Sequence, residues 1–439
     1  MKRPLSSEMT MLKTLSNTPT KRYEADRRQR QCGDSKSKNR NRIMTLSKII
    51  VAVLLFAGIG AVVLTSRKHL KSRILTDATT ADTTEKDNDI KIYPQSRNKK
   101  SYVVSNSPAV KGPWQNIQLP RNVIPERYEI DLDVDMDNDR YSGSVRILVK
   151  VTGNSVKHIL LHKSHINVHG IKVTDANRRT QNVKWTNEYK PNEYLVITME
   201  NPLKNNSQYY IETQFNADLR KDLTGFFVTR GGSGSKIAAT LLSPISTRKF
   251  FPCFDEPYFK ATFRVSVTHE VRYNALSNMP EESRTATNTT TRNATKTTFK
   301  ESLRMSTYML GLLLADDTYK VVEKRMHGSL AIQVWDFEGS QWNTETNELV
   351  ALLDYYEKKF FKLPFPLEKL DVAIMPDFIP GATETWGLMM FRVRLSNYHL
   401  LAHEIVHQWF GNLATMEFWD VAWIKEGKKL DIKIISLLK

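Results

Sequence analysis

The hydrophobic and polar positions of this 439-residue chain divide it into a polar start, one apolar stretch, a polar connector and a long patterned region. Residues 1–48 are polar and basic, without an apolar period. Residues 49–65 read IIVAVLLFAGIGAVVLT, and residues 66–112 are again polar, with runs such as TDATTADTTEKDND. Because apolar residues recur at regular spacing only after Trp114, the pattern predicts folded structure from about residue 113 onward.

Residues 113–320 alternate between apolar and polar positions, with Gly, Pro and Asn between the alternating segments. Examples are RYEIDLDVDM, SGSVRILVKV, EYLVITME, YYIETQFNA and KATFRVSVTH. Alternation of this kind predicts an antiparallel β domain. Within it, residues Phe250–Phe263 read FFPCFDEPYFKATF and contain no catalytic constellation of their own. We expect this aromatic-rich turn to serve packing.

Residues 321–439 follow a different pattern. A short strand pattern, SLAIQVWD, precedes TNELVALLDYYEKKFF, in which apolar residues recur at the i, i+3 and i+4 positions of a helix. The segment LPFPLEKLDVAIMPDF and a helix that contains HEIVHQWF follow. The sequence therefore predicts an α+β fold, with an antiparallel β domain followed by a mixed domain of strands and helices.

The motif H-E-x-x-H at His403–His407 is the strongest chemical signal in the chain. On a helix, His403 and His407 leave the same face one turn apart, so both ring nitrogens can reach one Zn²⁺ at about 2.0–2.1 Å. Glu404 between them can reach a water on the metal, and Glu426 offers a third ligand. A solvated helix face with two histidines is the alternative, but an acid that follows the motif favours a catalytic zinc site with one open position.

The formal net charge of +17 belongs mostly to the polar start and the connector. Residues 1–48 contain 13 Lys and Arg against 4 Asp and Glu, and residues 66–112 contain 10 against 5. The patterned region is close to neutral, which disfavours a nucleic-acid-binding protein. A disordered basic tail that faces anionic lipid on the cytoplasmic side explains the charge better.

The apolar stretch 49–65 is predicted to span a membrane, since its 17 residues reach the lower limit for a spanning helix. It follows a long tail, so we expect an uncleaved signal-anchor rather than a cleaved signal peptide. The basic residues ahead of it favour a cytoplasmic N-terminus. We therefore expect a single-pass type II plasma-membrane protein, with residues 66–112 as a flexible stalk and an extracellular C-terminal domain. The N-x-S/T sequons follow the span, in keeping with this orientation: Asn205, Asn288 and Asn293.

Three motifs, taken in order, resemble the aminopeptidase N-like gluzincin family of zinc aminopeptidases. FPCFDEP resembles the N-domain signature of that family, GATETWG (Gly381–Gly387) its exopeptidase motif, and HEIVHQWFGN with Glu426 its zinc motif. The resemblance runs from about Leu119 to Gly427. It implies a thermolysin-like zinc-peptidase domain over residues 321–439.

The family also implies a role for each matching residue. One Zn²⁺ per chain would be held by His403, His407 and Glu426, with Glu404 as the general base. Peptides with a free N-terminus would be the substrates. Their α-amine would bind Glu384, beside Gly381 and Ala382 of the same motif. The resemblance leaves open whether the protein forms a homodimer.

The chain also departs from the family pattern. Thr383 and Thr385 replace a Met and an Asn of the exopeptidase motif, and Leu241 stands at the position that matches a substrate-pocket Gln. Lys425 adds positive charge beside the third ligand. Because the sequence stops at Lys439, the resemblance predicts an end inside the catalytic domain.

These departures leave three interpretations open. The first is a membrane-bound ectoenzyme that removes N-terminal residues from peptides. The second is a truncated isoform or degenerate paralogue that binds a peptide or partner without cleaving it while tethered to the membrane. The third is an incomplete gene model of the enzyme.

Overall fold

The computed structural model describes residues 111–231, 234–288, 292–337, 345–393 and 398–427. These residues belong to one compact unit, Lys99–Lys439. The predicted tail 1–48, the predicted membrane span 49–65 and all but the last two residues of the predicted stalk lie outside them. None of the described helices combines the length and the apolar composition that a membrane span requires.

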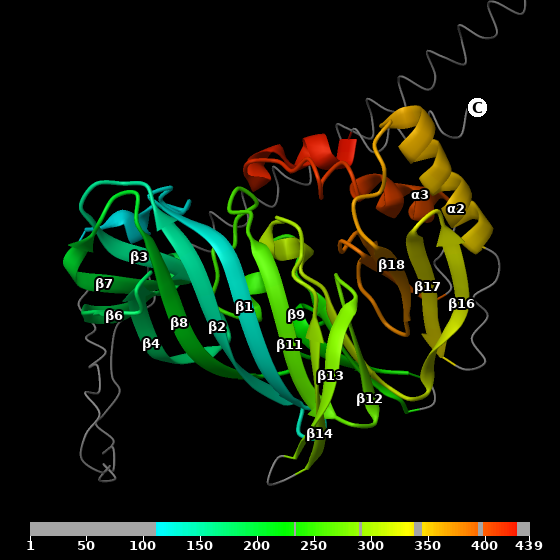
Figure 1. Ribbon diagram of the computed structural model, residues 1–439, viewed down its shortest axis with the longest axis horizontal. Coiled ribbons are helices and arrows are strands. Elements are labelled where there is room, and N and C mark those ends of the chain that lie inside the picture. The colour runs from blue at the N-terminus through cyan, green and yellow to red at the C-terminus, as the bar shows by residue number, and fades with distance from the viewer. Residues whose placement is uncertain (1–110, 232–233, 289–291, 338–344, 394–397, 428–439) are drawn as a thin grey trace, which may run out of the picture. The chain divides into compact units, whose positions relative to one another are not determined.

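Strands far outnumber helices among the described residues of this unit, and the largest sheet has eight strands in the order β13-β14-β11-β1-β2-β8-β4-β5 (Figure 1). Their bounds are β1 Val123–Asp135, β2 Arg140–Val151, β4 Asn167–Asp175, β5 Thr180–Gln181, β8 Gln208–Asp218, β11 Thr262–Glu270, β13 Glu281–Asn288 and β14 Asn293–Phe299. Side chains along β1 alternate as the sequence pattern predicts: Ile130 and Leu132 are buried, whereas Asp131 and Asp133 face solvent. The predicted β region is therefore present.

One pairing in this sheet corrects the prediction of a purely antiparallel domain. Strand β1 pairs with β11 in parallel, with Arg127 opposite Thr262, while its other edge pairs antiparallel with β2. Parallel neighbours need a long connection. Here residues 136–261 supply it, because they form the strands β2 to β10 before the chain returns to β1.

Two smaller sheets complete the β region. The three-stranded sheet β3-β7-β6 shares one apolar core with the large sheet, in which Ile147 of β2 and Ile197 of β7 are both buried. The four-stranded sheet β12-β15-β10-β9 connects the β region to the rest of the chain. Their bounds are β3 Val156–His162, β6 Val183–Tyr189, β7 Tyr194–Leu203, β9 Gly225–Arg230, β10 Lys236–Leu241, β12 Tyr273–Ser277 and β15 Leu312–Asp316.

The C-terminal part contains a mixed five-stranded sheet, β16-β17-β18-β20-β19. Its strands are β16 Tyr319–His327, β17 Leu330–Phe337, β18 Lys369–Met375, β19 Ala382–Thr383 and β20 Leu388–Arg392. The pairs β17–β18 and β18–β20 are parallel. A second core joins this sheet to the four-stranded one, for instance through Leu313 and Met390. The expected mixture of strands and helices is therefore found.

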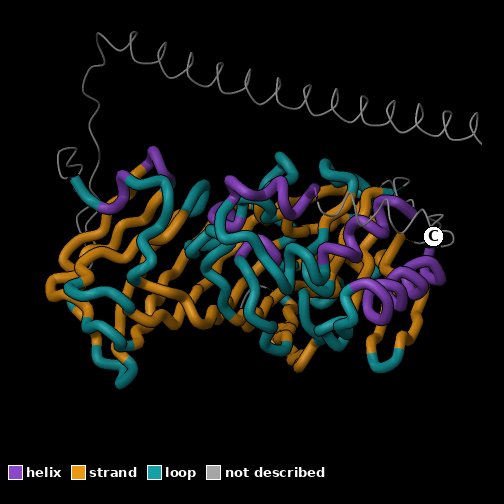
Figure 2. Tube along the Cα trace, turned by 90° about the horizontal axis from the view of Figure 1, so that it is seen from above, coloured by secondary structure: helices purple, strands orange, loops and turns teal. Residues whose placement is uncertain are grey.

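Within the part of the chain that the structure describes, helices are few and short. The predicted helix TNELVALLDYYEKKFF corresponds to α2 (Glu345–Tyr355) and a π-helical turn, Tyr356–Phe360. This run lies at the end of the molecule opposite to β6 and β7, as Figure 2 shows together with Figure 1. The other described helices are α3 Tyr398–His407, the short segment over residues 422–427, and the 3₁₀ turns Pro113–Gln115, Lys190–Asn192, Thr247–Lys249, Thr307–Met309 and Trp419–Val421.

The turn Phe250–Phe263 packs inside the β region, as predicted. Phe250, Phe251 and Cys253 are fully or almost fully buried. The buried carboxylate of Asp255 accepts hydrogen bonds from the Arg248 backbone N–H at 3.2 Å and from Arg248 Nε at 2.9 Å. The turn is therefore fixed by a buried ion pair as well as by aromatic packing.

Candidate metal centre

The helix α3 positions both histidines of the H-E-x-x-H motif. Its residues Leu401, Ile405 and Val406 are buried, which fixes the rotation of the helix. His403 and His407 then lie one turn apart, with ring centroids separated by 5.2 Å. The Nδ1–H of His407 donates to the Phe410 carbonyl at 3.0 Å. That hydrogen bond leaves Nε2 of His407 as the nitrogen with a lone pair.

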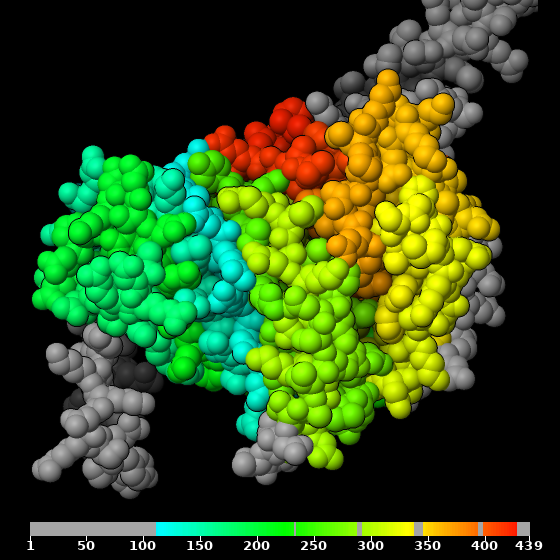
Figure 3. All heavy atoms as spheres, in the orientation of Figure 1, coloured from blue at the N-terminus to red at the C-terminus, as the bar shows by residue number. Residues whose placement is uncertain are grey.

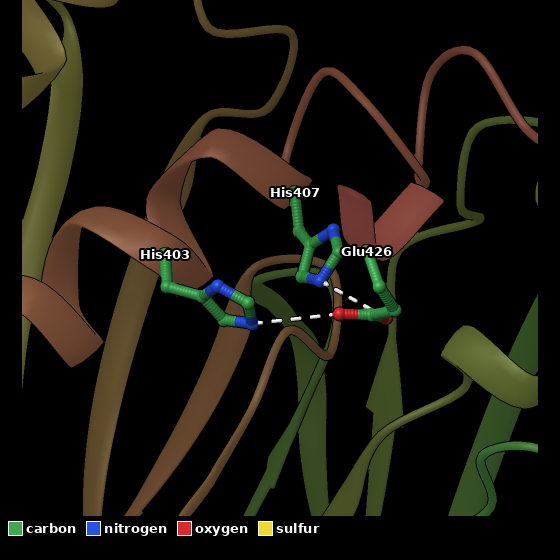
Figure 4. Close-up of side chains that lie close together, drawn as sticks. All are labelled: His403, His407 and Glu426. Carbon is green, nitrogen blue, oxygen red and sulfur yellow. Dashed lines mark ion pairs between the residues drawn. The ribbon is translucent and has the colours of Figure 1, made fainter. Parts of the chain in front are cut away.

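Glu426 lies close to both histidines, although it stands near the C-terminal end of the described residues. It lies in the helical segment over residues 422–427. Its Oε2 is 3.6 Å from His403 Nε2, and its Oε1 is 3.6 Å from His407 Nε2 (Figure 4). The candidate ligand atoms of the three residues all lie within 4.8 Å of one another.

These distances suit a zinc ion. A tetrahedral Zn²⁺ with bonds of about 2.0–2.1 Å keeps its ligand atoms about 3.4 Å apart, close to the observed 3.6 Å. Two imidazoles and one carboxylate form a donor set of the catalytic type. The His403 side chain is 27% exposed, against 2% for His407, so the group is open to solvent on the His403 side.

Glu404 and Glu384 lie beside this group. The buried Glu404 has an Oε1 3.9 Å from His403 Nε2. Glu384, Glu404 and His407 also form a group whose candidate ligand atoms lie within 4.8 Å of one another. The structure therefore brings all five charged or ligating residues of the sequence prediction together.

The loop that contains Glu384 is fixed by its neighbours. Gly381 and Ala382 lead into the two-residue strand β19, where Ala382 pairs with Phe391. The Glu384 carbonyl accepts hydrogen bonds from Gln408 Nε2 at 3.0 Å and from Asn412 Nδ2 at 2.9 Å. The end of the motif helix therefore holds the backbone of this loop.

At the end of this loop, Gly387 has a φ of +76°, and a Cβ there would come within 2.4 Å of the Asn278 carbonyl oxygen. Glycine is required at this position for both reasons.

Lys425 has a direct partner that the sequence did not reveal. Its side chain is buried, and its ammonium forms an ion pair with Glu384 Oε1. The same Nζ lies 3.6 Å from Glu426 Oε1 and 5.2 Å from the centroid of the Tyr308 ring. Burial alone would lower the pKa of Lys425, but the nearby charge of Glu384 raises it above its ordinary value.

The segment that contains these residues contacts the β region. Lys260 Nζ donates to the carbonyls of Asn412 and Leu413, at 3.2 and 2.9 Å, and Tyr308 donates to the Gly411 carbonyl at 3.0 Å. In the space-filling view the last described residues lie along the top of the molecule (Figure 3). The β region therefore supports the segment that carries Glu426.

Comparisons with known proteins match both parts of the chain. Residues 124–309 match the Peptidase M1 N-terminal domain, and residues 344–432 match the Peptidase family M1 domain. The chain belongs to peptidase family M1. This confirms the resemblance to the family of zinc aminopeptidases.

Several M1 aminopeptidases align with more than two thirds of the chain. Glutamyl aminopeptidase of Bitis rhinoceros is 35% identical over 337 residues, which cover 72% of this chain and 34% of that protein. Glutamyl aminopeptidase of Rattus norvegicus is 34% identical over 357 residues (76% and 37%). Aminopeptidase N of Canis lupus familiaris is 32% identical over 355 residues (72% and 35%). The chain thus spans about a third of the length of the curated relatives it matches.

Every predicted site residue lies within the M1 match at residues 344–432.

Sequence reasoning missed the anchoring roles of Gln408 and Asn412. Their polar side chains in the otherwise apolar HQWFGN were the available signal. It also missed a second group, in which His327 Nε2 is 2.7 Å from Glu357 Oε2 and Nδ1 is 3.6 Å from Asp354 Oδ1. No spacing rule connects the end of β16 with α2 and the π-helical turn that follows it, so no sequence signal indicated this group.

Proposed function

We propose that this M1 chain forms the zinc-binding part of an aminopeptidase that removes N-terminal residues from peptides. The observation that carries the proposal is the approach of His403 Nε2 and His407 Nε2 to different oxygens of Glu426, each at 3.6 Å. A Zn²⁺ ion held by these residues would polarise the scissile carbonyl and lower the pKa of a bound water towards 7.

The neighbouring carboxylates would supply the proton transfer and the specificity for a free N-terminus. Glu404 would take a proton from the attacking water and donate it to the leaving amine. Glu384 would bind the α-ammonium of the peptide, with Gly381 and Ala382 beside it. An anionic acceptor so close to the cleaved bond favours a chain end, since an internal residue offers no ammonium.

The domain division and the topology are part of the same proposal. We infer a β domain over residues 113–320, a catalytic part over residues 321–439, and a type II membrane anchor at residues 49–65 with its stalk. The exposed side chains of Asn205 and Asn293 support an extracellular face, because a glycosylation site must be accessible.

A second candidate function is a membrane-tethered module that holds a peptide without cleaving it. The ion pair between Lys425 and Glu384 favours this candidate, because the carboxylate expected to bind the α-amine already has a cationic partner.

The first candidate predicts that hydrolysis requires a free amine. Zinc-loaded chain should cleave an aminoacyl-arylamide but not its N-acetyl derivative, because only the former offers an ammonium to Glu384. Glu384→Gln should lower kcat/KM for the free amine by about 10-fold or more, the scale of one charge-assisted hydrogen bond.

Glu417→Gln is the matched control for this experiment, since Glu417 is exposed, pairs with Arg121 and is not among the residues of the group. Equal cleavage of the acetylated and free substrates would contradict an aminopeptidase. Binding of a peptide without turnover would favour the second candidate.

A further inference from the structure

The environment of Lys425 is unusual for a lysine. Only 5% of the residue is exposed, whereas lysines are rarely buried unless they are paired. Three groups surround its ammonium: the carboxylate of Glu384, the carboxylate of Glu426 and the face of the Tyr308 ring. Carboxylates and an aromatic face together are the surroundings that bind a primary ammonium.

That ammonium is the same chemical group as the N-terminus of a peptide. Both are –NH₃⁺ groups with three hydrogen-bond donors. Lys425 therefore presents to Glu384 the feature that the proposed function assigns to the substrate. The two ammonium groups would therefore compete for one carboxylate.

Glu384 is anchored through its backbone, whereas Lys425 reaches it with a long side chain. The Glu384 backbone is anchored through Gln408 and Asn412, and Thr383 Oγ1 donates to Glu384 Oε2 at 3.3 Å. Lys425 has a flexible four-carbon stem. Its Cε lies 2.9 Å from the position that a Cβ on Gly411 would take, so the stem passes over this glycine. An incoming ammonium would therefore displace the lysine and leave the carboxylate in place.

We propose that Lys425 is an internal competitor of the substrate amine and sets how tightly the site binds a free N-terminus. The inference rests on the proposed function, and it adds a specificity-determining residue to it. With Lys425 in place, the net binding free energy of a peptide amine is only the difference between its own interaction with Glu384 and that of the lysine. In a variant that lacks the lysine, the full free energy of the ammonium–Glu384 interaction contributes to binding.

The test compares binding of two small probes by calorimetry on metal-free protein. Leucine amide carries a free ammonium, and N-acetyl-leucine amide does not. Lys425→Gln and the apolar Lys425→Met should each bind leucine amide about 10-fold or more tightly than the original chain, because an unopposed ammonium–carboxylate contact then forms. Affinity for the acetylated probe should stay unchanged, and adding Glu384→Gln should remove the gain.

Two controls separate competition from a general loss of charge. Lys425→Arg keeps a cation at the site and should behave like the original chain. Lys260→Gln removes a neighbouring lysine that contacts the carbonyls of Asn412 and Leu413 but not Glu384, and it should give no gain. Unchanged leucine amide affinity in both neutral Lys425 variants, with melting temperatures like that of the original chain, would overturn the proposal. An equal gain for both probes would also overturn it.

Failure of the proposed function would look different. The probes report on Glu384 in metal-free protein, so the gain needs neither zinc nor turnover. If the chain proves inactive and the gain is observed, the competition stands while the catalytic proposal fails. If turnover depends on Glu404 and no gain is observed, the catalytic proposal stands and this inference fails.

Discussion

His407→Ala will lower the zinc affinity of the chain by more than about 100-fold, the upper range for changes that only disturb a ligand's support. His407 is the most buried of the three proposed ligands, and its Nδ1–H is fixed by the Phe410 carbonyl. Its Nε2 is therefore positioned for a metal before the metal binds. Competition against a chromogenic chelator measures the affinity.

Two matched variants make this result specific. His327→Ala removes a histidine that also lies among carboxylates, Asp354 and Glu357, and should leave the high-affinity zinc site intact. Glu404→Gln should also retain zinc, because Glu404 is not among the three proposed ligands. Zinc affinity that survives His407→Ala but is lost in His327→Ala would move the metal to the other group.

Asp255→Ala will lower the free energy of unfolding by about 3–5 kcal/mol, the usual loss when one partner of a buried ion pair is removed. The substitution leaves the Arg248 guanidinium, whose side chain is only 10% exposed, without its buried partner. It also removes the acceptor of the Thr307 hydroxyl, at 3.0 Å from Asp255 Oδ1. Urea denaturation followed by circular dichroism measures the change.

The control for this prediction is an ion pair on the surface. Glu282 pairs with Arg264, and the two side chains are 41% and 39% exposed. Glu282→Ala should therefore cost no more than about 1 kcal/mol. Similar losses in the two variants would show that burial does not decide the strength of the Asp255 contact.

Much of the fold followed from local sequence patterns, because such patterns depend on residues close together in the chain. Alternation predicted strands such as β1, and the i, i+3, i+4 spacing predicted α2. The parallel pairing of β1 with β11 did not follow, since it joins Arg127 to Thr262. Hydrophobic alternation determines which face of a strand is buried, but it does not determine its neighbour.

The same distinction applies to the candidate site: relations between residues close in sequence could be predicted, and contacts between distant residues could not. The spacing of His403 and His407 fixes their relation on any helix, and Glu426 entered through its distance from the motif. The partner of Lys425 could not be predicted, because Glu384 lies 41 residues away in sequence. Only the fold that brings the Gly381–Gly387 loop to the end of α3 reveals that a buried lysine pairs with the carboxylate proposed to bind the substrate amine.

The hydrolysis rate of zinc-loaded chain, compared between the original protein and Glu404→Gln at equal zinc content, tests the central claim most directly. We expect one zinc per chain in both proteins and cleavage of an aminoacyl-arylamide by the original chain. Its kcat should fall by about 10²–10⁴-fold in the variant, the contribution of a general base. Full zinc content with equal rates in the two proteins, or with no turnover in either, would contradict an aminopeptidase in which Glu404 moves the proton.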